Sequence, residues 1–123
     1  MVTKTLITKL VQDISHLYPA KNVKDLVRSL GGTLYIASND ILESGIMRHK
    51  DNFQICVSPH VGQKNTDYLI AYELGHLFLH MGYKTSPDLW RNQKNNSFYI
   101  EDNVEKTYEA AQFAFAMLAL FAE

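Results

Sequence analysis

The apolar positions in the first thirty residues predict two helices. Pro19 ends the first of them, because proline cannot continue a helix. The apolar residues that recur there at helical spacing are Leu6, Ile7, Leu10, Val11, Ile14 and Leu17. A shorter apolar pattern from Val23 to Leu30 predicts a second helix, and the Gly31-Gly32 pair after it is typical of a helix C-terminus.

The pattern then changes to that of short strands. Residues 33–37 are β-branched and aromatic, and Asn39-Asp40 after them is a turn signal. Residues 46–48 and 53–57 flank a polar turn at 50–52, so we expect them to form a hairpin.

A third helical pattern runs from Leu69 to His80, with Asn65 or Thr66 as its expected N-cap. Its polar positions are Tyr72, His76 and His80, spaced four residues apart, with Glu73 beside them. Its apolar positions are Ile70, Leu74, Leu77, Phe78 and Met81. This division predicts an amphipathic helix whose apolar side packs on a core and whose polar side lines a cleft or meets solvent.

The C-terminal third begins with a polar stretch, residues 83–96, that we expect to form a loop over the site. Trp90 lies within it and is either a lid residue or part of the core. Residues 104–121 then predict a helix that is apolar on nearly every side after Glu109. Such a helix is either central or a subunit contact. If the first helix does not cover it, we expect a homodimer or a docked partner, with Phe115 and Phe121 as anchors.

Composition narrows the class of protein. The 123 residues, 46% of them hydrophobic, fit one globular domain spanning 1–123. The net charge is −1 and no basic cluster is interleaved with aromatics, which disfavours direct nucleic-acid binding. No apolar run reaches the ~20 residues of a membrane span. The single cysteine, Cys56, predicts a buried thiol in a strand, and the N-terminus lacks a signal-peptide pattern, so we expect a reducing, cytoplasmic setting.

The helix at 69–80 contains most of a zinc-binding motif. In H-E-x-x-H, two histidines four residues apart bind one metal ion, and the glutamate between them polarises a bound water. Glu73 and His76 are in register with this motif, but Tyr72 stands where the first histidine should be. Catalytic zinc generally needs three protein ligands, and the ordinary tyrosine pKa of ~10 makes a phenolate ligand costly near neutral pH.

These residues give the chain a resemblance to a known family. The stretch Ala71 to His80, followed after a loop by Tyr108 to Leu118, resembles the ImmA/IrrE zinc metallopeptidases of phages and mobile elements, which regulate helix-turn-helix repressors by cleaving them. The resemblance implies an α+β, zincin-like fold, with helices packed on a small, mostly antiparallel sheet.

Residue by residue, the resemblance implies a partly lost site. It places Glu73 on the catalytic base and His76 on the second histidine ligand, but Tyr72 on the first ligand and Thr107 on the carboxylate ligand. Glu109 lies near Thr107 but one turn off the required face.

Two functions are therefore open. The favoured one is a metallopeptidase-like regulatory protein without peptidase activity or cofactor, which acts by binding a protein such as a phage-type repressor. The alternative is an active zinc metallopeptidase in which Glu73 is the base and His76 is joined by a substitute ligand, namely His80, Tyr72 or Glu109.

The motif residues also have plainer interpretations. His76 and His80 are then solvent-facing polar residues, and Glu73 hydrogen-bonds Tyr72 or a backbone amide. His60, after Pro59, is a weaker candidate for the cleft.

Overall fold

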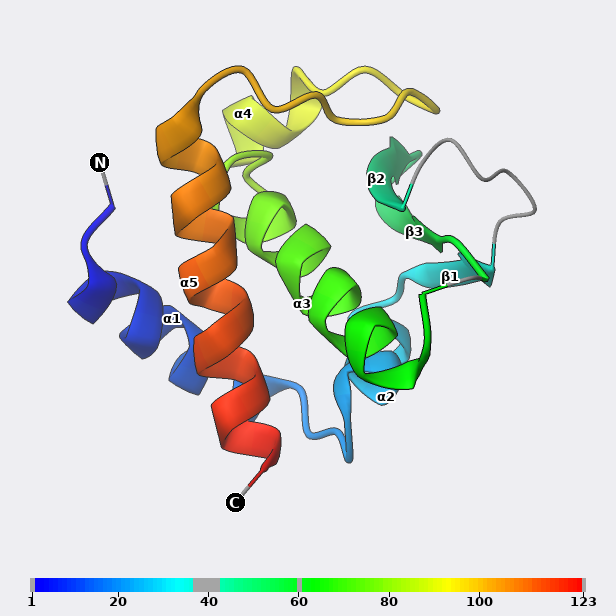
Figure 1. The fold of residues 1–123 in the computed structure, drawn as a ribbon. Helices are drawn as coiled ribbons and strands as arrows, with labels where there is room; N and C mark the ends of the chain where they lie inside the picture. The colour runs from blue at the N-terminus through cyan, green and yellow to red at the C-terminus, as the bar shows by residue number, and fades with distance from the viewer. Residues whose placement is uncertain (1, 37–42, 60, 123) are drawn as a thin grey trace.

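The computed structural model describes residues 2–36, 43–59 and 61–122, and within them it shows an α+β arrangement (Figure 1). The elements are α1 (Lys4–Leu17), α2 (Val23–Ser29), β1 (Thr33–Ile36), β2 (Ser44–His49), β3 (Asn52–Val57), α3 (Gln63–Leu79), α4 (Pro87–Arg91) and α5 (Val104–Phe121). Ala37, Asn39-Asp40 and His60 lie outside the described residues.

The two N-terminal helices form as predicted, and side-chain caps fix where they begin. Thr3 accepts a hydrogen bond from the backbone N–H of Leu6 at the start of α1, and Asn22 does the same for Asp25 in α2. The backbone of Gly31 has φ 89° just after α2, a conformation that glycine adopts without steric cost. Each cap satisfies backbone groups that a helix end leaves unpaired.

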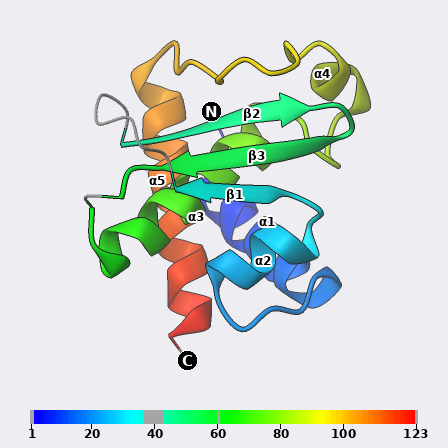
Figure 2. The same ribbon diagram turned by 90° about the vertical axis from the view of Figure 1, so that its right-hand side faces the viewer.

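The sheet has three strands in the order β1-β3-β2. The predicted hairpin is confirmed, because β2 and β3 pair antiparallel with Ile46 opposite Ile55. β1 pairs with β3 in parallel, with Leu34 opposite Ile55, so the sheet is mixed and not mostly antiparallel. Phe53, Ile55 and Val57 are buried at alternate positions of β3, and Figure 2 shows the helices behind one face of the sheet.

α3 is the central helix and lies between α5 and the sheet (Figure 1). Of the two surroundings expected for its polar side, a cleft or solvent, the solvent alternative is wrong for Glu73, His76 and His80, which are all buried. The predicted caps Asn65 and Thr66 are wrong as well. The helix begins earlier, after Gly62, with no side-chain cap.

α3 and α5 approach most closely at Gly75. A Cβ atom built on Gly75 would lie 3.0 Å from the Cα atom of Ala110 and 3.0 Å from the Cβ atom of Phe113. Any larger residue at position 75 would push the two helices apart. This close approach brings side chains of the two helices within hydrogen-bonding reach.

The polar stretch after α3 is only partly a loop, because it contains α4. Trp90, on α4, packs edge-on to Tyr83 with ring centroids 4.9 Å apart, and the Arg48 guanidinium lies 5.4 Å from its ring. Trp90 is therefore a half-buried residue that packs against the core, and it is not a lid residue. No helix among the described residues is both long and apolar enough to cross a membrane.

The segment after α4 runs along the free edge of β2. The backbone N–H of Asn96 donates to the carbonyl of Arg48 (2.8 Å), and that of Tyr99 donates to the carbonyl of Ile46 (2.7 Å). These bonds carry the chain across the top of α3, as the yellow and orange trace in Figure 1 shows. They fix the position of the residues that come next, Glu101 among them.

Candidate functional site: a carboxylate among donor side chains

The carboxylate of Glu101 lies among three donor side chains. One oxygen, Oε1, is 2.5 Å from Nε2 of His76 and also accepts from the hydroxyl of Tyr72. The other, Oε2, accepts from Oγ1 of Thr107 at 2.6 Å. Tyr72, His76 and Thr107 are the three residues that the family resemblance places on metal-ligand positions. The carboxylate therefore lies where those three side chains converge.

Helix geometry accounts for the arrangement. Tyr72 and His76 are one turn apart on α3, so their side chains lie on the same face. Thr107 comes from the first turns of α5, whose N-terminus is capped by Asn103. Glu101 comes from the extended segment just before that cap. Three separate parts of the chain thus meet at one carboxylate.

A line of polar contacts continues from His76 into the interior. Its Nδ1 atom is 2.8 Å from Nδ1 of His80, and Nε2 of His80 is 2.9 Å from Oε1 of Glu109. The second oxygen of Glu109 accepts from the backbone N–H of Val2 at 2.5 Å. The line thus links the surface segment at 101, the helix pair and the N-terminal segment. Such buried polar groups are costly unless each is paired.

The three side-chain contacts of this line are Glu101 with His76, His76 with His80, and His80 with Glu109, and each needs one proton to be a hydrogen bond. Two neutral imidazoles carry only two, so a third proton is required for all three contacts to be hydrogen bonds. Burial lowers the pKa of His76 and of His80, and their bonds to Glu101 and Glu109 oppose that effect. For both carboxylates burial raises the pKa, but the hydrogen bonds they accept outweigh it and the net shift is downward.

Glu73 occupies a different environment although it is adjacent to Tyr72. Its Oε2 atom accepts from Oγ of Ser44 at 2.5 Å, so its partner is neither Tyr72 nor a backbone amide. Burial raises the pKa of Glu73 to about 7; the Ser44 bond opposes the rise and the charge of Glu101 adds to it. Glu73 is thus a carboxyl whose protonated and ionised forms are both populated near neutral pH.

The donor set fits a carboxylate better than a zinc ion. Burial and the bond to Glu101 raise the pKa of Tyr72, which disfavours a phenolate ligand. Thr107 offers only a neutral hydroxyl, and among the histidines that the structure describes His76 alone has its Nε2 at this point. Within the described part of the chain, no group of three or more His, Cys, Asp or Glu side chains is placed to hold a metal ion.

The other candidate ligands face elsewhere. His80 and Glu109 bond to one another on the interior side of His76. The structure thus brings together Tyr72 and His76 but leaves Glu109 away from them, as its spacing from Thr107 suggested. Glu101 was not predicted from the sequence. No motif or periodicity marks it, and only the pairing of its segment with β2 brings it to His76.

A shallow cleft of about 520 Å³ opens over this point. It is lined by Glu43, Ser44, Tyr68, Leu69, Tyr72, Glu73, Glu101 and Thr107. The rings of Tyr68 and Tyr72 stack with centroids 6.0 Å apart, and Tyr68 also contacts the ring of Phe115 at 5.5 Å. The cleft wall therefore continues onto α5.

The outer side of α5 carries a stripe of exposed apolar side chains. Val104 (83% exposed), Tyr108 (54%) and Phe115 (64%) are spaced four and seven residues apart, so they share one face. Phe121 is only half-buried and packs against the core, so of the two predicted anchors only Phe115 is presented to solvent.

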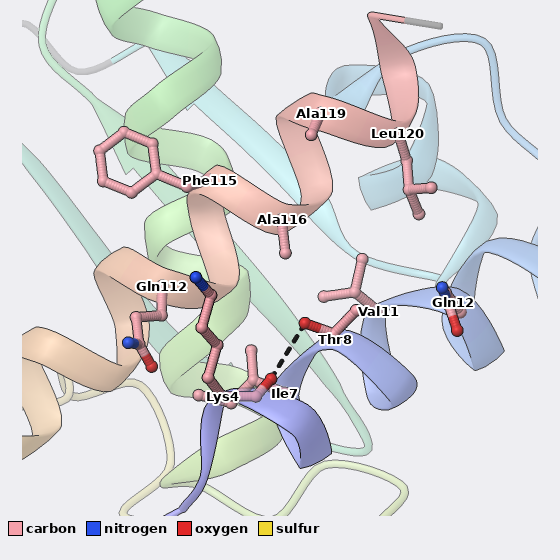
Figure 3. A pocket seen from close by; sticks show the side chains of 10 residues that line it. All are labelled: Lys4, Ile7, Thr8, Val11, Gln12, Gln112, Phe115, Ala116, Ala119 and Leu120. Carbon is pink, nitrogen blue, oxygen red and sulfur yellow. Dashed lines mark hydrogen bonds between the residues drawn. The ribbon is translucent and has the colours of Figure 1, made fainter.

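α1 covers only one side of α5. On that side a groove of about 470 Å³ separates the two helices (Figure 3). Ala116 and Leu120 of α5 point into the groove toward Ile7 and Val11 of α1, whereas the Phe115 ring points out of it. The first helix therefore does not cover α5 completely.

Comparison of the chain with models of protein families, with curated proteins and with solved structures finds no match.

Proposed function

We propose that this chain is a metallopeptidase-like regulatory protein that acts by binding a protein partner and does not cleave peptide bonds. The observation that carries the proposal is the Glu101 carboxylate at the meeting point of Tyr72, His76 and Thr107. Hydrolysis by a zinc enzyme requires a metal-bound water at that point, with Glu73 as its base. In this structure the Glu101 carboxylate takes up the donors at that point, and Glu73 bonds Ser44 instead.

The binding part of the proposal is supported by the stripe on α5. Val104, Tyr108 and Phe115 are exposed apolar side chains on one face of α5, and Phe115 contacts Tyr68 in the cleft wall. Exposed apolar patches on soluble domains are typical of protein contacts, and aromatic side chains contribute most to the affinity of such contacts. The resemblance to the ImmA/IrrE family indicates the partner class, a helix-turn-helix repressor.

The alternative is an active zinc metallopeptidase with substitute ligands. The one feature in its favour is that Glu101 and His76 point at the same place, so Glu101 could replace the carboxylate missing at Thr107. His80 and Glu109 are weaker substitutes, because each already has the other as its partner.

Elemental analysis of protein purified without chelator separates the two functions. The proposal predicts well below one zinc per chain and an unchanged melting temperature after EDTA. One zinc per chain, lost together with thermal stability, would support the enzyme, because a bound metal stabilises the folded state. A Glu73→Gln variant with unchanged zinc content would then show whether any peptidase activity on a casein substrate depends on the base position.

A further inference from the structure

We infer that Tyr72, His76 and Thr107 form a carboxylate-binding site, which Glu101 occupies in this structure and which an acidic side chain of the protein partner can occupy in its place. The part of the inference that concerns a protein partner rests on the proposed function. It deepens that function by naming the chemical group that the site recognises.

The donors are suited to a carboxylate. A carboxylate has two oxygens with about four acceptor positions, and here one oxygen meets Tyr72 and His76 while the other meets Thr107. Hydrogen bonds to an ionised acceptor are shorter and stronger than neutral ones, in keeping with the 2.5 and 2.6 Å distances to His76 and Thr107. The side chain of His76 is only 1% exposed, so its donor has little access to water.

The three donors lie on packed helices, whereas the occupant is the side chain of an extended segment. Tyr72, His76 and Thr107 lie on α3 and α5, which pack tightly at Gly75. Glu101 lies outside helix and strand, between Tyr99 and the cap at Asn103, with its side chain one third exposed. The side chain of its neighbour Ile100 is 81% exposed. The Glu101 side chain can therefore rotate out of the site while its backbone, held at Tyr99 and at the Asn103 cap, and the three donors keep their positions.

The surroundings of the site favour a carboxylate that belongs to a protein partner. The site opens into the cleft, and the cleft wall runs through Tyr68 to Phe115 on the apolar stripe. A partner that covers the stripe would bring its own side chains to the mouth of the cleft. An acidic residue at that point would meet the same three donors as Glu101.

Chemical rescue tests the binding site without knowledge of the partner. Glu101→Ala removes the occupant and leaves the buried imidazole without an acceptor, so its melting temperature should fall. Sodium acetate should restore it in a saturable way, by about 5 °C at ten times the dissociation constant. The His76 ring signals in NMR should shift along the same curve. EDTA in every sample ensures that a bound metal cannot produce the effect.

Matched controls make the rescue specific. Sodium chloride at equal ionic strength should not rescue Glu101→Ala, and acetate should not affect Asp102→Ala, which removes the adjacent carboxylate that pairs with Lys106. Adding Thr107→Val to Glu101→Ala should weaken acetate binding severalfold. Equal effects of acetate and chloride on the melting temperature, or no change in the His76 signals, would contradict the inferred carboxylate-binding site. That failure is distinct from failure of the proposed function, which zinc content decides.

The source of the carboxylate is tested with two small probes. N-acetyl-glutamate amide, which carries the acidic side chain of a peptide, should bind Glu101→Ala, and N-acetyl-glutamine amide should not. The wild-type protein should bind the acidic probe more weakly, because Glu101 competes for the donors. If acetate binds and the glutamate compound does not, the site admits only small free carboxylates and the partner half of the inference is wrong.

Discussion

Oε1 of Glu101 and Nε2 of His76 lie 2.5 Å apart although the two residues are separated by 25 positions in the chain. The contact places a carboxylate beside the histidine that the H-E-x-x-H pattern retains. The family resemblance places the missing carboxylate ligand at Thr107. The structure shows that position 101 already provides one.

Restoring one residue should therefore create a metal site. We expect Tyr72→His to bind about one zinc ion per chain, since the introduced imidazole would join His76 and Glu101 to give two imidazoles and a carboxylate, a common catalytic ligand set. Isothermal titration with zinc in chelator-free buffer measures the stoichiometry.

The matched control removes the carboxylate. Tyr72→His combined with Glu101→Gln should bind zinc far more weakly than Tyr72→His alone. Equal zinc binding by the single and double variants would show that Glu101 does not reach the metal. In that case a carboxylate at position 107, from Thr107→Glu, would be needed.

The stability of the protein should depend on pH through Glu73. Burial raises the pKa of this carboxyl from 4.5 to about 7, so the folded state holds the proton more tightly than the unfolded chain does. The resulting stability is fully present below about pH 4.5 and is lost as the pH rises through about 7, a change of about 3 kcal/mol.

Glu73→Gln removes this ionisation. Its free energy of unfolding relative to wild type should therefore increase between pH 5 and pH 8, by up to about 3 kcal/mol. Urea denaturation at several pH values measures the difference, with Glu105→Gln on the exposed side of α5 as the control. A difference that is constant across this range would contradict the raised pKa.

The buried pair His80 and Glu109 should be strongly coupled. Removing His80 leaves the Glu109 carboxylate with only the Val2 N–H, so His80→Leu should destabilise the fold by about 3 kcal/mol. His80→Leu combined with Glu109→Met should be more stable than His80→Leu alone, because no charge is then buried without a partner.

Thermal or urea unfolding of the wild type, His80→Leu, Glu109→Met and the double variant gives the coupling energy of the pair as a double-mutant cycle. Strictly additive losses would show that the two side chains do not interact in the folded protein.

The apolar stripe on α5 should contribute to association and not to folding. Phe115→Glu should change the free energy of unfolding by less than about 0.5 kcal/mol, since Phe115 is 64% exposed. Phe121→Glu is the contrasting variant and should cost about 2 kcal/mol, because Phe121 packs against the core.

Light scattering at micromolar concentration then reports on association. A wild-type dimer that Phe115→Glu converts to a stable monomer would assign the stripe to self-association. A monomeric wild-type protein would indicate that the stripe binds a different protein. A severely destabilised Phe115→Glu variant would contradict the exposed position of this ring.

The elements with regular periodicity could be predicted from the sequence. The range predicted for the last helix, 104–121, agrees with α5, because apolar residues recur along its length and Asn103 caps it. The start of α3 was misplaced because Gly62 precedes it without a side-chain cap. α4 was missed because it is only five residues long and lies in a polar stretch.

The site was harder to predict than the fold. Tyr72, Glu73 and His76 stand out because a helix repeats every three to four residues, so their spacing has a geometric meaning. Glu101 has no such spacing to any partner. It reaches His76 because Asn96 and Tyr99 bond to the edge of β2, and edge pairing of an irregular segment leaves no pattern in the sequence. The burial of His80 also depends on a partner in another element, Glu109.

The contact between Gly75 and Ala110 also offers a way to recognise related chains. A search for intact H-E-x-x-H motifs would pass over this chain, because Tyr72 stands at the first position of the motif. A pair of small residues at the crossing of the two helices is under a steric constraint that remains whatever the site binds. A glycine two residues after the motif glutamate, a small residue at the position of Ala110 and an acidic residue just before the last helix together make a signature that does not depend on zinc.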